Sequence, residues 1–147
     1  MHIGLPDPSR TDLGLLLLRL ATGGFLLPHG LGKLFGWFGG PQLSGFAIEL
    51  RDFGLPSAQP LPLLLAVAQT LPGLLIVMGL CTTIAAIVAA GFMVATVVLN
   101  RRRGWFWMHG GIEYPLLWTT ALVALALLGG GDWSLDALLS GQAGATP

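Results

Sequence analysis

The stretch LGLLLLRLATGGFLLPHGLGKLF, residues 13–35, decides how this chain folds. An apolar helix of about 20 residues crosses the roughly 30 Å hydrocarbon layer of a bilayer, and this stretch is long enough to do so. It also carries Arg19, His29 and Lys33. A charged side chain at the centre of a bilayer costs about 2.5 kcal/mol or more, so such residues indicate a functional site. The stretch therefore predicts a membrane helix with polar side chains inside the bundle.

Three more apolar runs have suitable length, at residues 61–80, 82–99 and 112–129. Only Cys81 separates the second span from the third, which predicts a tight helical hairpin. The third span carries small residues four apart, Ala86 with Ala90 and Gly91 with Ala95, a spacing that lets membrane helices pack closely. The predicted fold is an all-α membrane protein, a single domain over residues 1–147 that forms a four-transmembrane-helix bundle.

The composition agrees with a membrane protein and excludes several other classes. The chain is 54% hydrophobic and only 10% charged, against about 25% charged in soluble domains. Its formal net charge of zero gives no basis for nucleic-acid binding. One cysteine, Cys81, cannot form an intramolecular disulfide or an iron–sulfur site, and no histidines are paired for haem. No ligands for a metal stand at suitable helical spacing either.

Basic residues are divided unequally between the two sides of the predicted bundle. One side holds Lys33, Arg51 and the run 101–103, whereas the other holds only Arg10. The positive-inside rule then places loops 36–60 and 100–111 in the cytoplasm and both termini outside. The arginine run is expected to fix this topology and to touch anionic lipid. In the first of these loops, Phe46, Leu50 and Phe53 recur at near-helical spacing, which predicts a short amphipathic helix on the membrane surface.

Four polar residues fall at one level near the cytoplasmic end of the bundle. His29 and Lys33 are one turn apart and share a helix face. Gln69 in the second span and Glu113 at the start of the fourth reach the same height, so all four are expected to converge in a ligand-binding pocket. Glu113 and Lys33 would form an ion pair, and Gln69 or Tyr114 would complete its hydrogen bonds.

Each of these residues also has a purely structural interpretation. Lys33 lies close enough to the interface to snorkel. Glu113 could simply complement the positive end of its helix dipole. His29, between Pro28 and Gly30, could be a hydrogen-bonded core histidine.

Arg19 lies near the opposite end of the first span, about 9 Å deep, too far away to join this pocket. It either snorkels to the outer headgroups, pairs with Asp132 or belongs to a site. We expect a structural charge that anchors that end of the bundle. Asp132 and Asp136 themselves are expected to lie in a solvated tail.

These residues resemble the signatures of the DoxX family of small membrane proteins. Arg19, His29-Gly30 and residues 33–36 stand within the segment LLLLRLATGGFLLPHGLGKLFGWFGG. The later segments GGIEYPLL, residues 110–117, and DWSLDALL, residues 132–139, resemble the second and closing signatures. The resemblance implies a four-helix bundle in the prokaryotic inner membrane, similar to the small subunit of thiosulfate:quinone oxidoreductase. The chain departs from the family pattern at Gln69, where Glu is frequent, so Glu113 becomes the acidic group nearest the pocket.

The sequence is compatible with three functions. The first is a membrane subunit or partner of an envelope redox system that binds a quinone between His29 and Lys33, with Glu113 relaying protons. Its electrons would come from a redox partner subunit or directly from a substrate. The second is a non-enzymatic membrane anchor or assembly protein. The third is a small-molecule carrier, which would need a homo-oligomer because four helices are few for a transport path. Membrane lipid is a partner in every case, and the sequence identifies neither a reaction nor catalytic residues.

Overall fold

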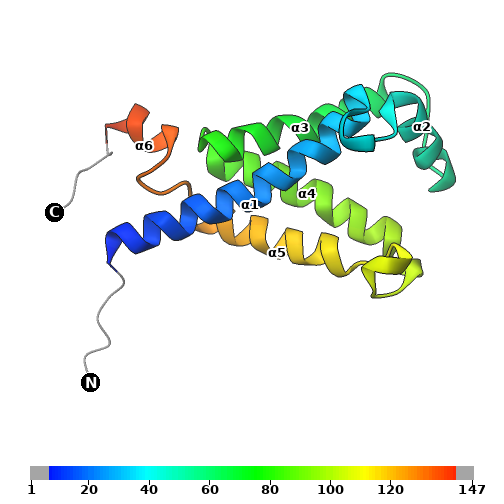
Figure 1. Cartoon of the computed structure of the whole chain (residues 1–147). Coiled ribbons are helices and arrows are strands. Elements are labelled where there is room, and N and C mark those ends of the chain that lie inside the picture. Colours follow the sequence, from blue (N-terminus) through cyan, green and yellow to red (C-terminus); the bar gives the residue numbers. More distant parts are fainter. Residues whose placement is uncertain (1–6, 142–147) are drawn as a thin grey trace.

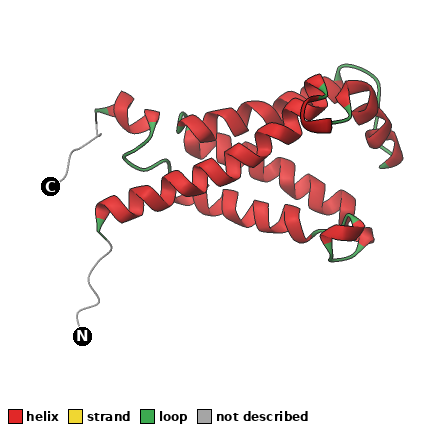
Figure 2. Cartoon of the chain, viewed as in Figure 1, coloured by secondary structure: helices red, strands yellow, loops and turns green. Residues whose placement is uncertain are grey.

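A computed structural model of the protein describes residues 7–141, and this part of the chain contains helices and no strand (Figure 2). The all-α prediction is therefore confirmed. The α-helices are α1 (Pro8–Phe35), α2 (Gln42–Asp52), α3 (Leu61–Met78), α4 (Thr82–Asn100), α5 (Glu113–Leu128) and α6 (Leu135–Ser140). Short 3-10 turns lie between them, η1 (Trp37–Gly39), η2 (Arg101–Arg103) and η3 (Trp107–His109).

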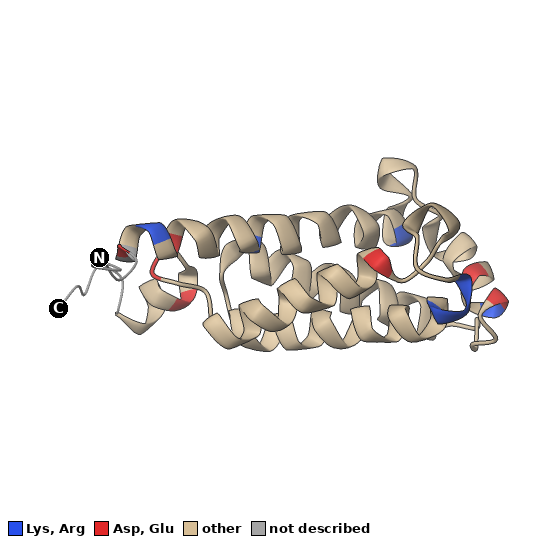
Figure 3. Cartoon of the chain, turned by 90° about the horizontal axis from the view of Figure 1, so that it is seen from below, with Lys and Arg blue, Asp and Glu red and all other residues tan. Residues whose placement is uncertain are grey.

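Three helices, α1, α3 and α4, are long and apolar enough to cross a membrane. The fourth predicted span corresponds to α5, which is apolar but has only 16 residues. At 1.5 Å per residue that is about 24 Å, somewhat less than the hydrocarbon thickness. The long helices α1, α3, α4 and α5 lie side by side (Figure 1). Charged residues gather mainly at the two ends of this bundle, and its middle is almost free of them (Figure 3).

Helices α1 and α3 cross closely because glycines face each other at their contact. A Cβ atom added to Gly23 would lie 2.6 Å from the carbonyl oxygen of Gly73, and one added to Gly30 would overlap the hydroxyl of Thr70. Glycine is thus required on α1 at both heights. This close approach holds the last two turns of α1, which carry His29 and Lys33, against α3.

The bundle core joins all four long helices. It consists of Leu26, Ile76, Ala85, Ala86, Ala89, Ala90, Met93, Leu122 and Leu125. The predicted small-residue contact of α4 is therefore half right. Ala86 and Ala90 are buried, whereas Gly91 and Ala95 lie on the exposed face. Small residues with the same four-residue spacing occur on both faces of this helix, so spacing alone could not identify the packed face.

The predicted hairpin between α3 and α4 is formed by residues 79–81. Gly79 and Cys81 both adopt left-handed backbone conformations there, with φ of 68° and 48°. The C-terminal helix α6 packs against this turn, and the Asp136 N–H donates to the carbonyl of Gly79 at 2.8 Å. Residues 130–141, which include Asp132 and Asp136, therefore belong to the fold and are not the solvated tail that the sequence predicted.

The predicted amphipathic element in loop 36–60 is α2. Its residues Phe46 and Leu50 are buried against Ala66 of α3. Burial of two large side chains fixes α2 beside the end of the bundle that carries Lys33. The helix thereby becomes a wall of the candidate site.

Candidate functional site

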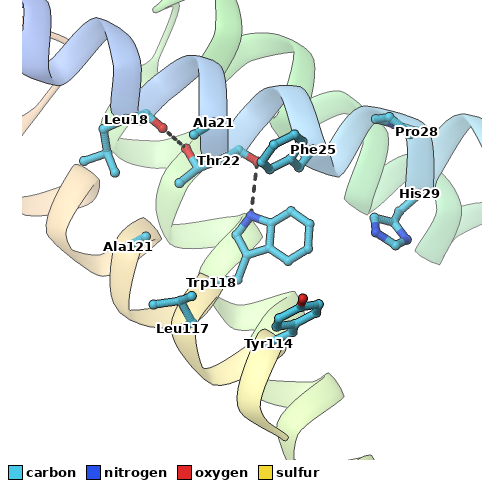
Figure 4. A pocket seen from close by; sticks show the side chains of 10 residues that line it. All are labelled: Leu18, Ala21, Thr22, Phe25, Pro28, His29, Tyr114, Leu117, Trp118 and Ala121. Carbon is cyan, nitrogen blue, oxygen red and sulfur yellow. Dashed lines mark hydrogen bonds between the residues drawn. The ribbon is translucent and has the colours of Figure 1, made fainter. Parts of the chain in front are cut away.

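A cavity of about 550 Å³ lies between α1 and α5 (Figure 4). Its lining consists of Leu18, Ala21, Thr22, Phe25, Pro28, His29, Tyr114, Leu117, Trp118 and Ala121. The α1 members recur at intervals of three and four residues, so they form one helix face. Two polar groups of this wall bond within it, because the Thr22 hydroxyl donates to the Leu18 carbonyl at 2.7 Å and the Trp118 indole donates to the Thr22 carbonyl at 3.2 Å. The cavity is therefore apolar except at the end formed by His29 and Tyr114.

Aromatic rings shape that end of the cavity. The Trp118 indole meets the His29 imidazole edge to face, with centroids 5.6 Å apart, and meets the Phe25 ring similarly at 6.4 Å. These contacts hold the imidazole at the cavity wall although its side chain is more than one-third exposed. Among the described residues the imidazole makes no hydrogen bond. Its ring nitrogens can therefore bind a ligand.

A second cavity, of about 430 Å³, begins where the first one ends. It shares Pro28 and His29 with the first, and its other lining residues are Gly32, Lys33, Trp37, Phe38, Gly39, Gly40, Pro41 and Glu49. The loop after α1 folds back over the last turn of that helix, because Gly32 and Gly40 pack backbone to backbone with no room for a Cβ atom. Three titratable side chains, His29, Lys33 and Glu49, line this one space.

Lys33 is held at this second cavity by a hydrogen bond and by two aromatic rings. Its Nζ donates to Gln69 Oε1 at 2.7 Å, which joins α1 to α3. The same Nζ lies 4.4 Å from the ring centroid of Phe46 and 5.2 Å from that of Phe92. Aromatic faces attract a cation, most strongly where water is excluded. The ammonium group keeps further N–H donors beyond the one that Gln69 accepts.

The structure divides the predicted pocket instead of assembling all of it. Lys33 bonds to Gln69, and Lys33 and His29 line the second cavity together, whereas Gln69 is in neither cavity lining. Glu113 does not join them, and within residues 7–141 it forms no ion pair with Lys33. Its carboxylate instead accepts from the Trp107 N–H at 3.2 Å. The predicted ion pair between Glu113 and Lys33 was wrong. Counting residues from the helix ends gives the height of a side chain along the bundle, but it does not give the direction in which the side chain points around the helix axis.

Tyr114 takes a different position from the one predicted. It lines the apolar cavity between α1 and α5, and its ring stacks on Trp107 with centroids 5.3 Å apart and planes 3° from parallel. It thus belongs to the wall of the first cavity, on the side opposite His29, and does not complete the bonding of Lys33.

Glu49 is the lining residue that the sequence interpretation missed. It was expected on the membrane surface with the rest of the 36–60 loop, yet α2 places it in the second cavity. One signal in the sequence pointed there. Glu49 follows Phe46 by three residues, so it shares the face of α2 whose Phe46 ring lies under the Lys33 ammonium.

Arg19 lies away from both cavity linings and is 2% exposed. Its guanidinium donates to the carbonyls of Ile76 and Val77 at 3.1 Å each, of Gly130 at 2.9 Å and of Trp133 at 2.7 Å. The sequence left open an ion pair between Arg19 and Asp132, but the four hydrogen bonds of the guanidinium all go to backbone carbonyls. Arg19 ties α1 to the end of α3 and to the segment before α6.

Sequence comparison assigns these residues to a known family. The profile of the DoxX family matches residues 14–110, about two-thirds of the chain. The chain belongs to the DoxX family. The matched range contains His29, Lys33 and Gln69 and ends before Glu113.

A curated relative of this DoxX protein is the putative oxidoreductase CatD of Bacillus subtilis (strain 168). It is 30% identical over 125 residues, which cover 85% of this chain and 86% of the relative. No solved structure matches the chain.

Proposed function

We propose that this DoxX protein binds a membrane quinone and acts as the membrane subunit or partner of an envelope redox system. The observation that carries the proposal is the junction of two unlike cavities at His29. The first cavity is mainly apolar, and the second is lined by the polar side chains of His29, Lys33 and Glu49. A quinone of the membrane pool also has two unlike parts, an apolar isoprenoid tail and a ring with two carbonyl acceptors. The two cavities provide one environment for each part.

In this proposal the tail lies along the apolar cavity between α1 and α5, which is lined by Leu18, Phe25 and Leu117 among others. The ring lies beside His29, and the imidazole and the Lys33 ammonium are the donors to its carbonyls. Lys33 has N–H donors left after its bond to Gln69. Glu49, at the same cavity, takes the place that the sequence interpretation gave to Glu113 as the nearby acidic group.

The proposed membrane arrangement completes this function. We propose that α5 is the fourth span, with the glycines on either side of its 16 residues lying in the headgroup layers. The excess of basic residues on one side places loops 36–60 and 100–111 in the cytoplasm of a prokaryotic cell and both termini outside its inner membrane. The polar cavity would then open toward the cytoplasm.

Electrons for such a quinone would come from a redox partner subunit. The relative in Bacillus subtilis carries the name of a putative oxidoreductase, which supports a redox setting. On this proposal the DoxX chain supplies the quinone site and the membrane attachment, and its partner carries the electrons.

The test is to purify the full-length protein in mild detergent and assay its organic extract for quinone by mass spectrometry. We expect a retained quinone that is lost from His29→Ala and kept by His109→Ala, a matched change on exposed η3 outside both cavities. Ala21→Phe should also lose it, because Ala21 lines the apolar cavity. A wild-type protein that retains no quinone and binds none on addition would refute the proposal.

A second candidate function is a non-enzymatic anchor or assembly protein for a redox system. The observation that favours it is Arg19, whose guanidinium donates to four backbone carbonyls within the fold and lines neither cavity. The quinone assay separates the two candidates. A pure anchor retains its partner and no quinone, and His29→Ala leaves the partner bound.

A further inference from the structure

The loop between α4 and α5, residues 101–112, has an ordered backbone. The N–H groups of Gly111, Ile112 and Glu113 donate to the carbonyls of Phe106, Gly104 and Trp105 at 3.0–3.1 Å. The Glu113 carboxylate adds a bond from the Trp107 N–H at 3.2 Å. These hydrogen bonds fix the backbone of the loop, and the backbone in turn fixes the directions in which the loop side chains point.

This ordered loop presents apolar side chains outward. The exposed fractions are 53% for Trp105, 61% for Phe106, 53% for Trp107 and 68% for Met108. Trp107 contacts Tyr114 with one face, and the remaining apolar surface of the loop has no cover within residues 7–141. Tryptophan and other large apolar residues at the ends of membrane helices characteristically lie in the headgroup layer. The loop fits a lipid environment better than water.

Three arginines stand directly beside the apolar tip. Arg101, Arg102 and Arg103 are all exposed and form η2 at the end of α4. No acidic residue occurs between Asn100 and Glu113, and the Glu113 carboxylate is bonded to the loop backbone. The Arg103 guanidinium lies 5.0 Å from the centroid of the Phe53 ring, which fixes it over the end of α2. Arg101 and Arg102 are exposed and remain available for a ligand, with Arg103 next to them in the chain.

We propose that Arg101 and Arg102, together with the tip residues 105–108, bind the headgroup of an anionic phospholipid. A guanidinium matches phosphate oxygens with paired, charge-assisted hydrogen bonds. The exposed Trp105 and Phe106 side chains lie among the glycerol and upper acyl groups of the same lipid layer. A zwitterionic headgroup has its own cation and would gain little from three clustered arginines. This lipid site does not depend on quinone binding at His29.

The test reconstitutes the full-length protein into vesicles of phosphatidylcholine that contain a minor share of brominated phosphatidylglycerol or, at equal mole fraction, brominated phosphatidylcholine. Bromine quenches the fluorescence of a tryptophan that it contacts. The share of the quenching that comes from the loop is the difference between the wild type and a Trp105→Phe/Trp107→Phe variant. We expect the anionic lipid to quench the loop more strongly. In Arg101→Gln/Arg102→Gln its apparent affinity should fall roughly 30-fold, because each of the two basic residues contributes about 1 kcal/mol near an anionic surface.

Arg10→Gln is the matched control, since Arg10 is an exposed arginine at the opposite end of the bundle. It should leave the loop preference unchanged. Equal quenching by the two lipids, or an unchanged preference in the double arginine variant, would overturn the proposal. Absence of quenching by either lipid would place the loop in water, overturn the lipid site and point to a soluble protein partner.

Discussion

Lys33 Nζ lies 2.7 Å from Gln69 Oε1, and this hydrogen bond joins α1 to α3 beside the second cavity, which Lys33 lines. Gln69 is 4% exposed, so its amide has no ready access to water as a substitute partner. The bond therefore both fixes the ammonium group at the cavity and satisfies a buried amide.

Replacing Gln69 by leucine should destabilise the protein by about 1.5–3 kcal/mol, the usual contribution of a hydrogen bond to a charged group. Gln69→Glu should retain or strengthen the contact, because a carboxylate would face the ammonium group. Thermal unfolding in detergent, followed by circular dichroism, measures both changes. Equal melting temperatures for the leucine and glutamate variants would show that the bond to Lys33 does not matter.

Arg19→Gln should lower the free energy of unfolding by about 3 kcal/mol or more, because several charge-assisted hydrogen bonds are lost at once. The carbonyls of Ile76, Val77, Gly130 and Trp133 would lose a common donor. Arg19→Lys should recover only part of the loss, since one ammonium cannot reproduce the planar guanidinium fork. The same melting experiment applies, with exposed Arg10→Gln as a control that changes little. Similar losses from both glutamine variants would contradict a structural role for the Arg19 network.

The sequence predicted the four long helices because they are apolar runs, whose existence depends on local composition, whereas the short helix α6 was expected as a solvated tail. Helix ends were less predictable. Residues 8–12 extend α1 because Asp7 caps its first turn, where its Oδ1 accepts from the Ser9 N–H at 3.3 Å. Gly129, with a left-handed φ of 77°, ends α5 one residue before the predicted boundary.

The candidate site was only partly predictable, and the reason differs from residue to residue. Counting depth along helices brought Lys33 and Gln69 to one level, and their helices happen to turn these side chains toward each other. The same count failed for Glu113, because its rotation about α5 directs it to the loop at Trp107. The spacing from Phe46 gives the face of α2 on which Glu49 lies. Its position in the cavity depends on how α2 docks on the bundle, which follows from the burial of Phe46 and Leu50.

Glu113→Gln tests the divided pocket. The Gln amide oxygen can still accept from the Trp107 N–H, and the wild-type bond is a long one at 3.2 Å. We therefore expect a loss of less than about 1 kcal/mol, within the range of an ordinary surface hydrogen bond. Quinone retention, measured by mass spectrometry of the extract, should change by less than about twofold. A loss of stability as large as that from Gln69→Leu would show that Glu113 interacts with Lys33 after all.

Asp136 caps the N-terminus of α4 from outside that helix. Its Oδ1 accepts from the Cys81 N–H at 2.6 Å and its Oδ2 from the Thr82 N–H at 2.8 Å. Partial burial of the carboxyl opposes its ionisation. The hydrogen bonds from Thr82 and Cys81 and the positive charge of Arg19 outweigh that effect and lower the pKa of Asp136 below its ordinary value. A group whose pKa is lower in the folded state stabilises the fold only while it is ionised.

The contribution of Asp136 should therefore be complete above the unfolded-state pKa of about 4 and should disappear as the pH falls through the lower folded-state value. Asp136→Asn should destabilise the protein by about 1 kcal/mol at pH 7, as expected for loss of a charged helix cap. The difference from wild type should shrink steadily below about pH 4, which melting temperatures measured from pH 7 to pH 3 would reveal. Asp132→Asn is the matched control, because Asp132 is exposed and is bonded in the fold through its backbone N–H, which donates to Asp12 Oδ1 at 2.8 Å. A pH-independent difference for Asp136→Asn, or one no larger than that of Asp132→Asn, would show that the carboxylate does not stabilise α4.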